Sequence, residues 1–254
     1  MLNKKSINIV VSILILCTIL LLMWIRPFGG NTHKSGEQVS SVAVEKIDEA
    51  KSFSLGEALR LGYEEARKHT EEEPLLIDLS STDSSSVPQK KTDGMDGKRN
   101  SWNMTFGTKR GSIHISIEIN NGLISVPQIA NDNNNGLRKG MYALSDIQVD
   151  SPQVIQKAIE ILGIRPGDPA ISDDWIKGFH FSIAPFQTNP SKPSDTTLLL
   201  EVTGISPHSP NSKNESLRMI VYFNVKTGEI FNASEMMGYD KDGRTTWKAI
   251  DLIH

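Results

Sequence analysis

The sequence predicts an α+β protein in which two repeated units, each a helix packed on an antiparallel sheet, follow one N-terminal transmembrane helix. Residues 7–25 form an uncharged, apolar run. A helical pattern followed by alternating strand patterns then occurs twice, over residues 54–128 and 150–232. Cys17, the one cysteine of the chain, lies in the apolar run, so the remainder is expected to fold without disulfides or cysteine-based zinc sites.

The apolar run is predicted to be an uncleaved signal-anchor. Its 19 residues would span roughly 28 Å as an α-helix, which matches the hydrocarbon core of a bilayer. No small-residue cleavage site follows it directly, and the run continues past Cys17, which disfavours lipid attachment there. We therefore expect a cytoplasmic tail at residues 1–6, a membrane helix at 7–25 and a spacer at 26–53.

The distribution of charge favours an extracytoplasmic location for the rest of the chain. Lys4, Lys5 and the amino terminus precede the run, against Arg26 and Lys34 beyond it, which slightly favours an inside N-terminus. Beyond residue 30 the chain carries all 30 acidic residues and 24 of the 27 basic ones, a net charge of −6. Because no basic patch stands out, no nucleic-acid partner is expected.

The first unit, residues 54–128, begins with a helix start signal. Ser54 and Glu57 have the spacing of a capping box. The residues predicted to form the buried face of this helix are Leu55, Ala58, Leu59, Gly62 and Ala66. Strands are predicted near residues 75–79, 102–106, 113–119 and 123–126, with a turn at 120–122.

The second unit, residues 150–232, repeats that order after a linker at 129–149. Asp150 and Pro152 mark a helix start and Gly163 its end. Strand patterns follow near residues 179–183, 198–202, 219–225 and 229–231. The remainder, 233–254, is expected to be a C-terminal tail whose residues 246–253 form a short closing helix.

The second unit resembles the PepSY domain. The resemblance is carried by the helix start at residues 150–152, by Leu198-Leu199-Leu200-Glu201-Val202, and by the "N-x-x-T-G-x-I" hairpin of Asn224, Thr227, Gly228 and Ile230. The first unit looks like a diverged copy, with its hairpin at 117–124. PepSY domains occur in propeptides and in anchored or secreted bacterial proteins, so the resemblance implies a non-enzymatic module that regulates a peptidase or another cell-surface process.

No catalytic, cofactor-binding or metal-ligating residue is predicted. The run from Asn131 to Gly136 has the oxygen-rich composition of a calcium loop, but the EF-hand pattern needs Asp first and Glu twelfth, where Asn131 and Tyr142 stand. The histidines are scattered, and neither a G-x-S-x-G elbow nor a phosphate-binding glycine loop is present. The sequence therefore predicts a protein that is not an enzyme and has no cofactor.

Two pairs of residues have an alternative interpretation as part of a functional site. Asp173 and Asp174 could form an acid pair, although a solvated turn is the favoured interpretation. Trp102 and Trp175 could line a groove, although tryptophans are more often core residues.

The leading functional hypothesis is a bacterial, membrane-anchored, extracytoplasmic interaction or regulatory protein. Its expected partners are the membrane, through residues 7–25, and another protein at the cell surface. The alternatives are a cell-envelope hydrolase of an unrecognised type, which requires a cleft with titratable groups, and a structural subunit of an envelope complex.

Overall fold

The computed structural model describes residues 51–82, 92–109, 113–131, 140–168, 177–187, 196–209 and 217–252. The predicted tail at 1–6, the membrane helix at 7–25 and most of the spacer lie outside these ranges. Within the ranges, no helix has both the length and the apolar character needed to cross a membrane. Residues 47–254 form one compact unit.

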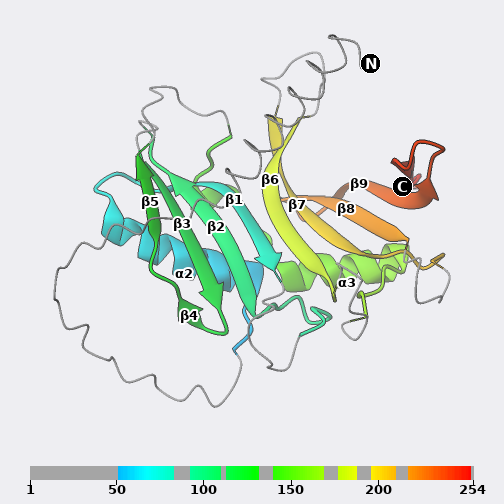
Figure 1. Ribbon diagram of the computed structural model, residues 1–254, viewed down its shortest axis with the longest axis horizontal. Coiled ribbons are helices and arrows are strands. Elements are labelled where there is room, and N and C mark those ends of the chain that lie inside the picture. Colours follow the sequence, from blue (N-terminus) through cyan, green and yellow to red (C-terminus); the bar gives the residue numbers. More distant parts are fainter. Residues whose placement is uncertain are drawn as a thin grey trace, which may run out of the picture. The chain divides into compact units, whose positions relative to one another are not determined.

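Two α-helices and ten strands make up the described part of this unit (Figure 1). The helices are α2 (Leu55–Ala66) and α3 (Ser151–Leu162), with 3-10 turns η1 (Arg67–His69) and η2 (Leu144–Asp146). The strands before α3 are β1 (Leu75–Thr82), β2 (Ser101–Gly107), β3 (Ile113–Asn120), β4 (Leu123–Ile124) and β5 (Gln128–Asn131). Those after α3 are β6 (His180–Gln187), β7 (Thr196–Ile205), β8 (Arg218–Asn224), β9 (Ile230–Tyr239) and β10 (Thr245–Ala249).

The predicted fold class of two repeated helix-plus-sheet units is wrong. All ten strands belong to one antiparallel sheet with the order β10-β9-β8-β7-β6-β1-β2-β3-β4, and β5 pairs with β3. The strands from residues 54–128 and 150–232 are joined edge to edge, because β1 pairs with β6. The repeated element order was a local pattern, and local patterns do not reveal that the two strand sets share a sheet.

The junction between β1 and β6 is short. Only Leu79 with Ile183 and Ser80 with Ser182 are paired across it, whereas β6 and β7 are paired over eight positions from His180 to Gln187. Beside the junction, Tyr142 pairs with Leu76 through two backbone hydrogen bonds of 2.8 and 2.9 Å. Tyr142 belongs to the segment before α3, which was predicted to be a linker. This segment pairs with the edge of β1 at a position where β6 no longer does.

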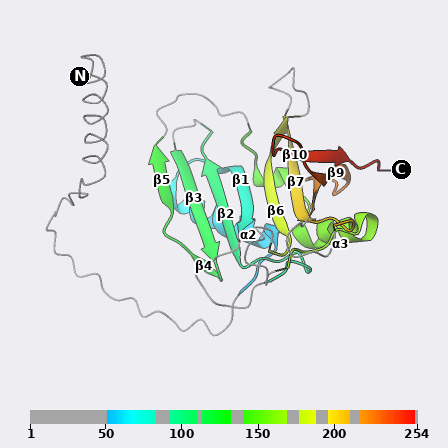
Figure 2. The ribbon, with the colours of Figure 1, turned by 45° about the vertical axis from the view of Figure 1, so that its right-hand side comes forward.

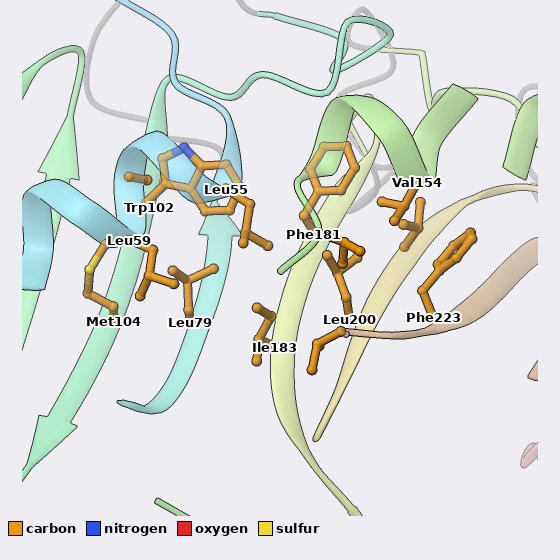
Figure 3. Close-up of a cluster of buried hydrophobic side chains, with 14 of the residues drawn as sticks. Leu55, Leu59, Leu79, Trp102, Met104, Val154, Phe181, Ile183, Leu200 and Phe223 are labelled. Atoms are coloured by element: carbon orange, nitrogen blue, oxygen red, sulfur yellow. The ribbon is translucent and has the colours of Figure 1, made fainter. Parts of the chain in front are cut away.

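One hydrophobic core underlies both parts of the sheet. Leu55 and Leu59 of α2 lie near Leu79 and Met104, while Val154 of α3 lies near Phe223 (Figure 3). All five residues predicted for the buried face of α2 are buried. On α3, Val154, Ile155 and Ala158 are buried, whereas Ile159 and Leu162 are partly exposed.

The predicted local signals at the helix ends are confirmed. Ser54 Oγ accepts a hydrogen bond from Glu57 N at 3.2 Å, and Ser54 N donates to Glu57 Oε2 at 2.8 Å, which completes a capping box. Asp150 caps α3, and Gly163 ends it with φ of 65°. The β3–β4 turn uses Asn121 and Gly122, both at positive φ.

The C-terminal residues differ from the sequence expectation. β9 extends to Tyr239, and Thr245–Ala249 form β10 instead of part of a helix. Because β10 pairs with the outer edge of β9, it ends the sheet on that side (Figure 2).

Candidate functional site

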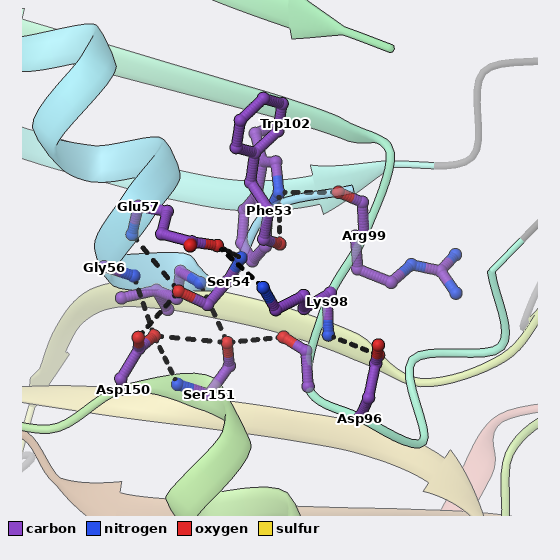
Figure 4. Close-up of polar contacts among 12 residues, drawn as sticks. Phe53, Ser54, Gly56, Glu57, Asp96, Lys98, Arg99, Trp102, Asp150 and Ser151 are labelled. Carbon is purple, nitrogen blue, oxygen red and sulfur yellow. Dashed lines mark hydrogen bonds and ion pairs between the residues drawn. The ribbon is translucent and has the colours of Figure 1, made fainter. Parts of the chain in front are cut away.

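The N-termini of α2 and α3 meet at one carboxylate, that of Asp150 (Figure 4). Asp150 Oδ1 accepts from Gly56 N at 2.8 Å and Ser151 N at 2.7 Å, and Oδ2 accepts from Ser54 Oγ at 2.6 Å. The negative charge therefore lies at the positive ends of two helices. With donors on both oxygens, this carboxylate is positioned to hold the helices together.

Ser151 extends the same contact to the loop before β2. Its hydroxyl accepts from Leu55 N at 2.8 Å and donates to Gly97 O at 2.6 Å. Gly97 has φ of 76°, and a Cβ there would lie 2.4 Å from Pro152 N. The loop can approach α3 this closely only because residue 97 lacks a side chain.

Arg99 and Trp102 fix that loop from the other side. The buried Arg99 guanidinium donates to Thr92 O at 2.6 Å and Lys177 O at 2.8 Å. The indole N–H of Trp102 lies 3.2 Å from Phe53 O and 3.1 Å from Arg99 O, and its side chain is fully buried. Trp102 is therefore a core residue, which is the interpretation that the sequence favoured. The carbonyl groups of Phe53 and Arg99 satisfy its buried indole N–H.

A serine, a histidine and a carboxylate meet beside β9. Ser206 Oγ donates to Glu235 Oε1, and His208 Nδ1 lies 2.9 Å from the same oxygen. Burial raises the pKa of Glu235, but the hydrogen bonds from Ser206 and His208 and the nearby charges of His208 and Lys248 outweigh it, so the pKa falls below its usual value. Sequence reasoning did not find this cluster, because its members are brought together only by the pairing of the sheet.

The order of these groups differs from that of a catalytic triad. A triad needs the imidazole between the hydroxyl and the carboxylate, so that the ring can take the serine proton. Here the carboxylate lies between the hydroxyl and the ring, and Ser206 Oγ also accepts from His208 N at 3.0 Å. The arrangement anchors the turn after β7 to β9, and Arg165 Nη2 reinforces it by donating to Ser206 O at 2.9 Å.

A metal-binding cluster of three or more His, Asp, Glu or Cys side chains is absent from the described ranges. His114 lies in β3 and His180 in β6, on strands that do not pair with each other. The calcium-like loop after Asn131 and the residues Asp173, Asp174 and Trp175 lie outside the described ranges.

Two surface hollows contain titratable groups. One of about 740 Å³ is lined by residues 68–72 and Ile113, and its His69 and Lys68 both contact Glu65, at 3.3 and 2.6 Å. Another, of about 350 Å³, lies between Tyr142 and the ends of β7 and β8. Its Asp146 and Lys226 form an ion pair of 3.5 Å with each other. In the second hollow, the two charged groups are thus paired with each other.

The β9–β10 hairpin carries the feature best suited to recognition. Four large apolar side chains on it are exposed by 41–67%: Phe231, Met237, Tyr239 and Trp247. The ring of Phe231 lies 6.1 Å from that of Phe186, which in turn lies 5.2 Å from that of Tyr222. We name these four exposed residues the hairpin surface.

This surface was missed from the sequence because residues 246–253 were interpreted as a helix. The alternation of Arg244, Thr246 and Lys248 with Thr245, Trp247 and Ala249 is the signal that indicates a strand. The alternation covers few residues, and strand preference depends on the neighbouring strand, here β9.

Comparisons with known proteins identify no family. No protein-family model and no curated protein matches the chain. The crystal structure of a candidate lipoprotein from Clostridium difficile 630 is similar with a TM-score of 0.43 and 10% identity. The match covers 75% of this chain and 97% of that one. At this TM-score and identity, the similarity supports no inference about the chain described here.

Proposed function

We propose that this chain is a membrane-anchored, extracytoplasmic, non-enzymatic protein that binds another protein through the hairpin surface. The observation that carries the proposal is the exposure of Phe231, Met237, Tyr239 and Trp247 on one terminal hairpin. Clustered exposed aromatic and methionine side chains are typical of protein-binding surfaces, because their burial in a complex contributes most of the binding free energy.

The chemistry of the described residues supports a binding role more than a catalytic one. The Ser206 hydroxyl is held by Glu235 and His208 N instead of by an imidazole base. The charged groups of the hollow beside Tyr142 are paired with each other. These features give the hydrolase alternative less support.

The location and the PepSY likeness remain predictions within this proposal. The anchor rests on the apolar run at residues 7–25. The hairpin residues of the PepSY likeness form the β8–β9 turn, where Asn224 Oδ1 accepts from Lys226 N at 2.8 Å and Gly228 has φ of 68°. If the likeness is homology, the expected partner class is a peptidase or another cell-surface protein.

Site-specific photocrosslinking in intact cells tests the proposal. A photoreactive phenylalanine analogue would replace Phe231, Tyr239 or, as a control, Ile161, which is 56% exposed on α3. We expect one protein to be captured from positions 231 and 239 and not from position 161. Capture from all three positions alike, or from none, would contradict the proposal.

A further inference from the structure

The strand β10 ends the sheet, and among the described residues nothing pairs with its outer edge. Within the described residues it pairs with β9 alone. An edge strand presents a row of backbone donors and acceptors that another extended chain can use.

The backbone hydrogen bonds show which residues of β10 face outward. Arg244 O accepts from Asp240 N at 2.8 Å, and Ile250 N donates to Ala233 O at 2.9 Å, so both even-numbered positions face β9. Because successive residues of a strand direct their amides to opposite sides, Thr245, Trp247 and Ala249 direct theirs to the free edge. Four of the five residues of β10 are exposed, all but Thr246.

The side chains divide in the same way between the two faces of the sheet. Thr245, Trp247 and Ala249 share one face, and Trp247 is paired there with Met236. Arg244, Thr246 and Lys248 share the other, where Lys248 is paired with Glu235. An incoming strand would therefore meet an apolar row on one face and a basic row on the other.

We propose that β10 accepts an extended segment of the partner protein as an eleventh strand, and that acidic and apolar residues alternate along this segment. This inference rests on the proposed function. Its acidic side chains would lie beside Arg244 and Lys248 and its apolar ones beside Trp247. Opposite charges across neighbouring strands stabilise pairing, and like charges destabilise it.

The same charges disfavour pairing of β10 with a second copy of itself. Two copies of β10 could pair antiparallel with Trp247 of the first copy opposite Trp247 of the second. Lys248 of the first copy would then lie opposite Thr246 of the second. Its diagonal neighbours would be Arg244 and Lys248 of the second copy. Such a pair gathers four positive charges on one face. The basic row therefore selects an acidic strand over this chain's own.

Peptide binding to the 254-residue chain in detergent micelles tests the inference. The probe is acetyl-Thr-Glu-Val-Glu-Val-Glu-Thr-amide, with a matched peptide containing Lys for Glu and a scrambled peptide of the same composition. We expect saturable binding of the Glu peptide alone, and slower hydrogen exchange of the amides in residues 245–249 when it binds. No binding of the Glu peptide up to ~1 mM, or equal binding of the three peptides, would overturn the inference.

Two variants separate the backbone contribution from the charge contribution. Ala249→Pro removes an outward amide without removing a bond to β9, so the chain should stay folded and bind the Glu peptide at least about tenfold more weakly. Arg244→Glu should weaken binding of the Glu peptide about fivefold and strengthen binding of the Lys peptide. Strand addition would be contradicted if the folded Ala249→Pro variant bound the Glu peptide as tightly as the wild type. It would also be contradicted if the amides of residues 245–249 were already protected from exchange without peptide, because the chain forms a dimer.

The result is distinguishable from failure of the proposed function. If Ala249→Pro leaves the capture from position 231 intact, the hairpin surface binds a partner by another mode and strand addition alone is wrong. If positions 231 and 239 capture nothing, the proposed function itself is wrong.

Discussion

Asp150 Oδ1, at the N-cap of α3, accepts a 2.8 Å hydrogen bond from the backbone N–H of Gly56 in the first turn of α2. The two residues are 94 positions apart in the chain. One carboxylate thus satisfies donors at the beginning of both helices, and it links the two parts of the structure on the sheet face that α2 and α3 cover.

Replacing Asp150 by Ala should destabilise the protein by about 2–4 kcal/mol, because the substitution leaves Gly56 N, Ser151 N and Ser54 Oγ without their acceptor. Urea unfolding at neutral pH measures the loss. The exposed Asp251→Ala serves as a control and should change stability by less than about 0.5 kcal/mol. Equal effects of the two variants would show that the carboxylate does not join the helices.

Gly97→Ala should destabilise the protein much more than Gly243→Ala. Both glycines have nearly the same φ, 76° and 75°, so the backbone cost of about 1 kcal/mol is common to both. Only at position 97 would the new Cβ meet backbone, 2.4 Å from Pro152 N, and we expect about 2 kcal/mol of further loss there. Comparable melting temperatures for the two variants would contradict the close approach of this loop to α3.

The stabilising contribution of Glu235 should disappear in acid. Its pKa is lowered in the folded protein despite burial, because Ser206, His208 and Lys248 favour the carboxylate. The contribution is therefore present above the ordinary value of 4.5 and is lost as the pH falls through the lower, folded value. The difference in unfolding free energy between the wild type and Glu235→Gln, measured from about pH 6 to pH 3, should shrink, whereas a constant difference would refute the assignment.

Tyr222 should ionise at an unusually high pH. Burial, followed by the charge and the hydrogen bond of Glu201, raises the pKa of Tyr222 to about 12. Absorbance titration should show a late tyrosinate step that is missing in Tyr222→Phe and lies at lower pH in Glu201→Gln. Circular dichroism at each pH checks that the chain is still folded, and identical titration curves for the three proteins would rule out the contact.

Local structure was predictable where short-range contacts specify it. The capping box of Ser54 and Glu57, the Gly163 helix end, and the turn at Asn121 and Gly122 each depend on residues within four positions of one another. The strand from Ile113 to Ile119 was likewise predictable, because its alternating pattern requires only that one face of the strand is buried.

The candidate site was not predictable in the same way. Phe231 and Trp247 become part of one hairpin surface because β10 pairs with the outer edge of β9. Without that pairing, the spacing of Trp247 and Ile250 fits one helix face as well as it fits a strand end. The cluster of Ser206, His208 and Glu235 depends on other pairings, those of β8 with β7 and with β9.

The sequence by itself determined the helices, their caps and the faces they bury, because caps and periodicity act over a few residues. Only the tertiary structure decided that the strands form one sheet. The decisive contact, between Leu79 of β1 and Ile183 of β6, joins residues about a hundred positions apart through backbone groups that every residue carries. Such pairing has no side-chain signature, so which strand edges are joined, and which strand ends the described sheet, follows from tertiary packing.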